Sequence, residues 1–233
     1  MLEAGPLLGA NPVSSEYLEA YRALRASILS MQKDKPITTI LITSATPGEG
    51  KTTVAVNLAT VLAMAEKKTL LVDADFRRPQ IHLLFEIDQA PGLTEVGMGD
   101  ARLEEAVVKA YIEHLYILPA GERTEEGADM MGSVRMHQVL GEMKQQFEVV
   151  IFDSAPVNAF AGALQVAAVM DLVLLVVRSR AYAGPVQRAL RSLEAVGANV
   201  PGVVLNDVMA VDREYAPTYY GYGYGEERSG GAP

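Results

Sequence analysis

The sequence has no cysteine in 233 residues, so disulfides and thiolate chemistry are excluded. Its apolar runs are no longer than a β-strand, well short of the roughly 20 residues that span a bilayer. The first 13 residues lack the basic start and apolar centre of a secretory signal. We therefore expect a cytoplasmic location.

Positive charge is also scarce, with 20 Lys and Arg against 29 Asp and Glu and a formal net charge of −9. Such a field repels nucleic acid and anionic lipid, so we expect no nucleic-acid partner. Hydrophobic residues make up 49% and charged residues 21% of the chain, which are ordinary globular proportions. The length suits one α/β domain with a tail.

The composition divides the chain into three segments. Residues 1–13 are rich in glycine, proline and small residues and are predicted to form an N-terminal arm. Residues 14–210 are predicted to form the folded domain, beginning with a helix over 14–32 that Ser14 or Ser15 can cap. Residues 211–233 are rich in Gly, Tyr, Glu and Pro and cannot bury enough apolar surface to fold alone. We expect this tail to be disordered.

Apolar runs alternate with amphipathic helical segments along the folded domain. The runs are nearly continuous in Val, Ile and Leu, as in strands covered by helices on both faces. They cover residues 38–43, 69–73, 115–118, 149–153, 172–177 and 202–205. This alternation predicts a doubly wound, mostly parallel sheet, in which ligands bind beyond the carboxyl ends of the strands. The polar residues near those ends are Ser44, Asp73, Asp153 and Asn206.

The segment Ala-Thr-Pro-Gly-Glu-Gly-Lys-Thr, residues 45–52, lies between a predicted strand and a predicted helix. It matches a P-loop in which Ala45 replaces the first glycine. Backbone N–H groups can surround phosphate oxygens, Lys51 can contact the β and γ phosphates, and the Thr52 hydroxyl can bind magnesium. The flanking strand and helix favour this reading over a simple glycine-rich turn. The predicted nucleotide contacts are Pro47, Gly48, Glu49, Gly50, Lys51, Thr52 and Thr53.

Carboxylates follow two of the predicted strands. Asp73 and Asp75 leave the end of one strand, and Asp153 ends another in the arrangement of a Walker B aspartate. Clustered carboxylates beside a triphosphate need a cation to offset their repulsion, and magnesium accepts carboxylate and phosphate oxygens. The sequence therefore predicts a magnesium-dependent nucleotide site.

The P-loop, the run Leu-Val-Asp-Ala-Asp-Phe-Arg-Arg-Pro at residues 71–79, the Asp153 strand and a tyrosine-rich tail together resemble the bacterial tyrosine kinases (BY-kinases). These enzymes have a P-loop NTPase fold and accompany capsule and exopolysaccharide export machinery. The resemblance extends over about residues 14–224. It implies an ATP- and Mg²⁺-dependent protein tyrosine kinase that releases ADP and regulates polysaccharide export.

Individual roles follow from the same resemblance. Lys51 and Thr52 match the Walker A positions, and Asp73 and Asp75 match a second Walker-type motif. The resemblance implies that Asp73 accepts the proton of an incoming tyrosine hydroxyl. Asp75 and Asp153, together with Thr52, would then hold magnesium, directly or through water.

Five of the ten tyrosines lie in the last 19 residues: Tyr215, Tyr219, Tyr220, Tyr222 and Tyr224. A low-complexity tether is one reading of this composition. The resemblance implies instead a cluster of autophosphorylation sites. Because each phosphate adds about −1.5 to −2 charges, a modified tail would repel an already acidic body and loosen an oligomer.

On the first helix, Glu19, Arg22 and Arg25 are spaced three residues apart, which is typical of an intrahelical ion-pair face. The same spacing matches a BY-kinase motif that packs subunits into a ring, so the resemblance implies a homo-oligomer formed through this helix. It also implies a partner, the cytoplasmic segment of a membrane polysaccharide co-polymerase, which would hold the protein at the inner face of the membrane. Protein tyrosines would be the substrates.

Other residues keep two interpretations. Arg77 and Arg78 lie close enough in sequence to the paired aspartates to touch phosphate or a neighbouring subunit, or they form a solvated turn. Asn206 is placed to read the nucleotide base, or it starts a turn.

Two alternative functions stay open. A partition or septum-positioning ATPase shares the fold but carries a lysine early in the loop, where this chain has Thr46. A nucleotide-binding scaffold with weak kinase activity is suggested by departures from the family pattern. These are Glu-Arg-Thr-Glu-Glu-Gly after Gly121, Ser154-Ala155-Pro156 after the Walker B strand, and Gly162 where an aspartate is common.

Overall fold

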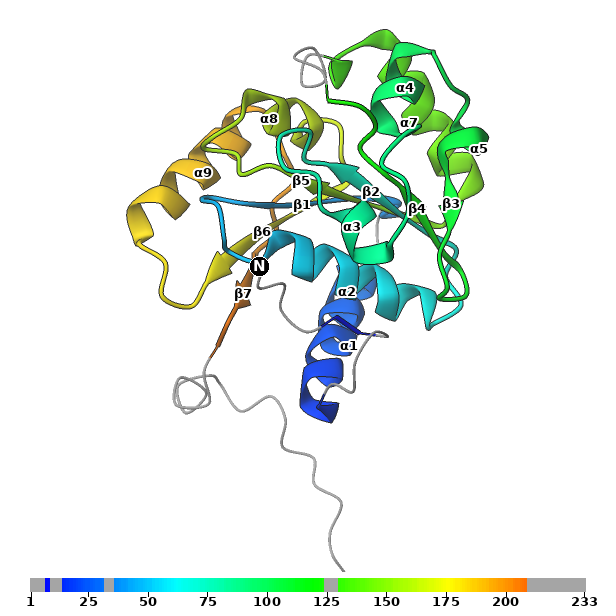
Figure 1. The fold of residues 1–233 in the computed structure, drawn as a ribbon. Helices are drawn as coiled ribbons and strands as arrows, with labels where there is room; N and C mark the ends of the chain where they lie inside the picture. Colours follow the sequence, from blue (N-terminus) through cyan, green and yellow to red (C-terminus); the bar gives the residue numbers. More distant parts are fainter. Residues whose placement is uncertain (1–6, 9–13, 32–35, 124–129, 209–233) are drawn as a thin grey trace, which may run out of the picture.

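The computed structural model describes residues 7–8, 14–31, 36–123 and 130–208. Its centre is a seven-stranded sheet in the order β3-β4-β2-β5-β1-β6-β7 (Figure 1). The strands are β1 (Thr39–Ser44), β2 (Thr69–Ala74), β3 (Val108–Lys109), β4 (Leu115–Leu118), β5 (Val149–Ser154), β6 (Leu172–Arg178) and β7 (Val203–Asn206). Neighbouring strands run parallel, except that β3 pairs antiparallel with β4. All six predicted strands are present, and the mostly parallel sheet is confirmed.

Helices cover both faces of the sheet (Figure 1). They are α1 (Ser15–Ser30), α2 (Lys51–Ala63), α3 (Ile81–Phe85), α4 (Leu93–Met98), α5 (Leu103–Ala106), α7 (Val134–Gln146), α8 (Ala161–Ala167) and α9 (Ala183–Ala195). Side chains of the central strands alternate between two buried clusters. Ile40 and Ile42 of β1 pack in the cluster that contains α2, whereas Leu41 between them packs in the cluster of α7 and α9. The fold is therefore doubly wound, as predicted.

Helix α1 begins where the sequence indicates, because the Ser14 hydroxyl accepts a hydrogen bond from the backbone N–H of Tyr17 at 3.3 Å. The helix packs on α2, the helix that follows the P-loop. Asn57 of α2 donates to the Tyr17 hydroxyl at 2.9 Å and accepts from the backbone N–H of Leu8 at 2.8 Å. Asn57 is fully buried, so these bonds fix α1 and the residues before it to the body of the domain.

The predicted tail, with its five tyrosines, and most of the predicted N-terminal arm lie outside the described residues. Among the described residues, no helix combines the length and the apolar character needed to cross a bilayer.

Candidate active site

The P-loop connects the carboxyl end of β1 to the first turn of α2. Gly48 and Gly50 have φ angles of +82° and +87°, in the left-handed region that favours glycine. Gly50 is the N-cap residue of α2, and no side chain caps that end of the helix. The N–H groups of the first turn and the partial positive charge of the helix are thus available to an anion.

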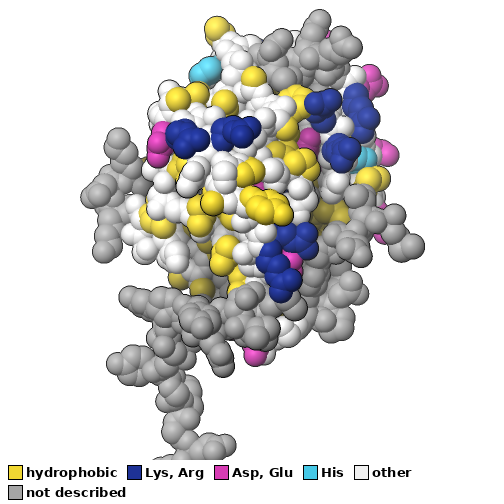
Figure 2. Space-filling model, turned by 90° about the vertical axis from the view of Figure 1, so that its left-hand side faces the viewer, with side chains coloured by type: hydrophobic (Ala, Val, Ile, Leu, Met, Phe, Trp, Pro, Cys, Tyr) yellow, Lys and Arg dark blue, Asp and Glu magenta, His cyan; other side chains and the backbone are white. Residues whose placement is uncertain are grey.

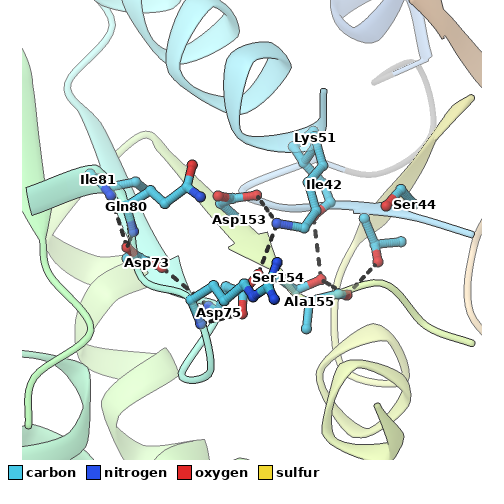
Figure 3. A network of polar contacts seen from close by, with 12 residues as sticks. Ile42, Ser44, Lys51, Asp73, Asp75, Gln80, Ile81, Asp153, Ser154 and Ala155 are labelled. Atoms are coloured by element: carbon cyan, nitrogen blue, oxygen red, sulfur yellow. Dashed lines mark hydrogen bonds and ion pairs between the residues drawn. The ribbon is translucent and has the colours of Figure 1, made fainter. Parts of the chain in front are cut away.

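Lys51, the first residue of α2, carries the positive charge of the site. Its Nζ lies 2.9 Å from Asp75 Oδ2 and 3.9 Å from Asp153 Oδ1 (Figure 3). Burial lowers the pKa of Lys51, but the charges of Asp153 and Asp75 more than offset this effect and keep that pKa above its ordinary value. The lysine therefore stays charged and ties the P-loop helix to two strand ends.

Asp153 lies at the carboxyl end of β5, in register with Asp73 on β2 and with Ile42 on β1. It is almost fully buried. Burial raises the pKa of Asp153, although the charge of Lys51 and a hydrogen bond from the Thr52 hydroxyl act in the opposite direction. The Oδ1 atom is buried and accepts no hydrogen bond in the part of the chain that the structure describes. Such an oxygen can bind a cation without breaking an existing hydrogen bond.

Asp73 has a different environment from the other two aspartates. Its Oδ2 accepts the backbone N–H groups of Gln80 and Ile81 at 2.9 and 3.0 Å, and its Oδ1 accepts that of Asp75 at 3.2 Å. Figure 3 shows the carboxylate turned toward Gln80 and Ile81, away from Lys51. Burial and the charge of Asp153 raise the pKa of Asp73 to about 7, despite these hydrogen bonds. In this conformation Asp73 organises the loop between β2 and α3.

Asp75 lies between the Lys51 ammonium and a backbone N–H of the loop after β2. Its Oδ2 binds Lys51, and its Oδ1 accepts the backbone N–H of Arg78 at 3.1 Å. The guanidinium of the preceding Arg77 lies over the ring of Phe160, 4.5 Å from the ring centroid. This contact joins the loop after β2 to the segment after β5.

The P-loop is braced by polar contacts that the sequence did not indicate. The Glu49 side chain is buried and accepts the backbone N–H of Thr46 at 2.8 Å. Asn206, at the end of β7, donates from its side-chain amide to the Glu49 carbonyl at 2.9 Å and lies against Gly50. Pro47 and Gly48, at the tip of the loop, are exposed, and Thr53 is partly exposed. The Asn206 amide is thus at the P-loop, as a nucleotide contact requires, and its role in reading the base stays a prediction.

The residues present fit a magnesium–nucleotide complex. The described residues contain no group of three or more His, Asp or Glu side chains that could hold a metal ion alone. Magnesium bound beside phosphates needs only one or two protein carboxylates, because phosphate oxygens and water complete its shell. The hydrogen-bond-free Oδ1 of Asp153, with Asp75 and Thr52 beside it, meets that requirement.

The three α1 side chains predicted to form an interface make contacts within their own chain. Arg22 and Glu19 form an exposed ion pair of 2.6 Å. Arg25 donates to the carbonyl of Val61 in the last turn of α2 at 2.7 Å, where the helix dipole favours a cation. The intrahelical pair agrees with the simpler interpretation of this spacing, and the ring contact stays a prediction.

The sequence and the fold have counterparts among known proteins. Residues 37–199 match the family model described as an AAA domain. The chain is 34% identical over 205 residues to the tyrosine-protein kinase YwqD of Bacillus subtilis, covering 87% of this chain and 86% of that protein. It is 31% identical over 218 residues to the tyrosine-protein kinase etk of Escherichia coli, covering 93% of this chain but only 30% of that protein.

The structures agree with the sequences. The kinase domain of the Escherichia coli tyrosine kinase ETK superposes with a TM-score of 0.80 at 32% identity, over 89% of this chain and 80% of that one. The residues that match the family model include the P-loop, both aspartate motifs and strands β1 to β6. The chain belongs to the bacterial tyrosine kinase family.

Proposed function

We propose that this protein transfers the γ-phosphoryl group of ATP to tyrosine hydroxyls, with Mg²⁺ as cofactor, and that it regulates capsule or exopolysaccharide export. The observation that carries the proposal is the position of Lys51. Its ammonium lies between Asp75 and Asp153 at the N-terminus of α2, so phosphate-binding N–H groups, a cation and metal-binding carboxylates meet at one point.

The chain's own groups have separate tasks in this reaction. The N–H groups of residues 48–52 hold the β and γ phosphates, and Lys51 leaves Asp75 to contact them. Asp75, Asp153 and Thr52 hold the metal ion. When bound, Mg²⁺ neutralises charge on the phosphate oxygens and fixes their orientation. The protein therefore acts mainly by positioning and charge compensation, as phosphoryl transfer requires.

The acceptor must lose a proton during the transfer. The tyrosine oxygen forms a bond to the γ-phosphorus, the bond from that phosphorus to the bridging oxygen breaks, and the hydroxyl proton passes to a carboxylate. Asp73 has a pKa of about 7, which suits a general base near neutral pH. To act, it must exchange at least one of its three backbone hydrogen bonds for the tyrosine hydroxyl. We assign this role to Asp73 on that condition.

The substrates in this proposal include the chain's own tail. Tyr215, Tyr219, Tyr220, Tyr222 and Tyr224 would be phosphorylated by a neighbouring subunit of a ring that forms through α1. A cytoplasmic segment of a membrane co-polymerase would activate the enzyme and hold it at the membrane. These proposals rest on membership in the family and on the tail sequence.

A labelling experiment tests the proposal. Purified protein is incubated with γ-labelled ATP and Mg²⁺, with and without the partner's segment, and the phosphorylated residues are mapped by mass spectrometry. We expect phosphate on the tail tyrosines, lost in Lys51→Met and retained in Lys109→Met, a control that removes an exposed lysine from β3. Free phosphate without labelled protein would instead support the partition-type ATPase, and neither product would support the scaffold.

A further inference from the structure

Two consecutive arginines, Arg77 and Arg78, follow Asp75 at the edge of the site, and both are exposed. Among the described residues, no carboxylate forms an ion pair with either guanidinium. In contrast, Arg102 and Arg178 each bind an acidic partner at 2.7 Å. Two unpaired cations beside the site are notable in a chain with a net charge of −9.

Asp75 lies between the P-loop and the loop that carries these two arginines. One oxygen of Asp75 binds Lys51, which belongs to the P-loop helix, and the other oxygen binds the backbone N–H of Arg78. The carboxylate thus lies between the nucleotide side of the site and the arginine loop. In an in-line transfer the acceptor approaches the γ-phosphate opposite the leaving group. A tyrosine that approaches over the loop after β2 would therefore pass these arginines.

The loop that carries the two arginines is held in place. Asp73 binds the backbone N–H groups of residues 75, 80 and 81, and Arg77 rests on the Phe160 ring at 4.5 Å. The carboxyl ends of the parallel strands lie on the left of Figure 1, and Figure 2 shows the molecule from that side. Figure 2 shows Lys and Arg side chains in separate groups on this face, with apolar side chains between them. Positive side chains on a loop that is held in place can select a negatively charged peptide.

We infer that Arg77 and Arg78 bind carboxylates that flank the acceptor tyrosine, so that the enzyme selects acidic tyrosine peptides. This inference rests on the proposed kinase function. The tail supplies such sequences, because Asp212 and Glu214 precede Tyr215, and Glu226 and Glu227 follow Tyr224. Tyr219, Tyr220 and Tyr222 have no acidic residue within three positions. The outer tyrosines should therefore be phosphorylated before the inner ones.

The test measures peptide binding to the full-length protein with Mg²⁺ and a non-transferable ATP analogue. Two fluorescent peptides of residues 209–233 are compared by anisotropy, both with every tyrosine changed to phenylalanine. The first keeps the four tail carboxylates, and the second carries Asn or Gln in their place. An exposed arginine–carboxylate pair changes a binding constant by about two- to fivefold, so two pairs should favour the acidic peptide by about tenfold.

Arg77→Ala/Arg78→Ala should reduce this preference to less than about twofold. The matched control is Arg188→Ala/Arg191→Ala, which removes the same charge from two exposed arginines of α9 and should keep most of the preference. Because Arg77 also packs on Phe160, Arg78→Glu provides a second test that leaves that contact intact. It should abolish most of the preference for the acidic peptide, because one attractive group, Arg77, and one repulsive group, the new carboxylate, then oppose each other.

Three results would overturn the inference. These are equal affinity of the wild type for both peptides, an equal loss of preference in the α9 control, or a loss of affinity for the ATP analogue alone in the Arg77/Arg78 variants. The kinase proposal fails separately, if no tyrosine of the unmodified tail is phosphorylated while the preference in binding persists.

Discussion

Replacement of Lys51 by methionine tests the electrostatic arrangement of the site without any ligand. The ammonium contacts Asp75 at 2.9 Å and Asp153 at 3.9 Å, and both carboxylates are buried. Removing one partner of a buried ion pair costs about 3–5 kcal/mol, because a charge is left uncompensated. The Lys51 side chain is 14% exposed. We therefore expect the lower end of that range, about 3 kcal/mol at pH 8.

The stability lost in Lys51→Met should decrease as the pH falls. The pKa of Asp153 is already raised by burial, and without Lys51 it must rise further. A carboxylate with a raised folded-state pKa destabilises the fold above that pKa, and the cost disappears as pH falls toward the unfolded-state value of about 4. The stability difference between Lys51→Met and the wild type should therefore shrink between pH 8 and pH 5.

Thermal unfolding followed by circular dichroism measures this difference. For a domain of this size, about 3 kcal/mol corresponds to a decrease in Tm of roughly 6–12 °C. The double variant Lys51→Met/Asp75→Asn should recover part of the loss, because it also removes one uncompensated carboxylate. A wild-type Tm for Lys51→Met at pH 8, or a deficit that grows at pH 5, would refute the proposed arrangement.

Three further predictions address the loop, the helix contact and the buried aspartate. Gly50→Ala forces a left-handed φ of +87° on alanine and places its Cβ against Asn206, so this variant should not bind ATP in calorimetry. The control Gly184→Ala has open space around the added Cβ and should bind ATP normally. Asn57→Ala loses the two hydrogen bonds that the Asn57 side chain makes to Tyr17 and to Leu8, and urea unfolding should show a loss of about 2–3 kcal/mol. An unchanged midpoint would contradict that contact. Asp73→Asn removes a carboxyl of pKa about 7. The stability of this variant relative to wild type should therefore rise with pH from 5 to 7, by at most about 1.4 kcal/mol per pH unit. A stability difference that is independent of pH would show that Asp73 has an ordinary pKa.

The sheet could be predicted because its signal is local. Five of the six predicted strands are largely buried aliphatic runs, and β1, β2 and β5 are buried along their entire length, whereas β7 exposes Val203 and Leu205. Strand β3 was missed, since it has two residues and both are exposed. Neither apolar character nor alternation marks so short a strand.

The parts of the site that could be predicted are those with a fixed spacing in sequence. Lys51 and the strand-end carboxylates meet because parallel strands end at the same edge of the sheet. The contacts of Asp73, Arg77 and Asn206 were not predicted, because their partners depend on how the intervening loops fold. Arg77, for example, rests on Phe160, which comes from the segment after another strand.

The magnesium dependence of ATP binding tests the central claim most directly. Titration calorimetry of the wild type and of Asp153→Asn is carried out with Mg²⁺ and with EDTA. If Asp153 and Asp75 hold the metal against the phosphates, Mg²⁺ should increase the ATP affinity of the wild type by about tenfold or more, and Asp153→Asn should lose most of that gain. ATP affinity that is the same with and without Mg²⁺ in the wild type would contradict the claim.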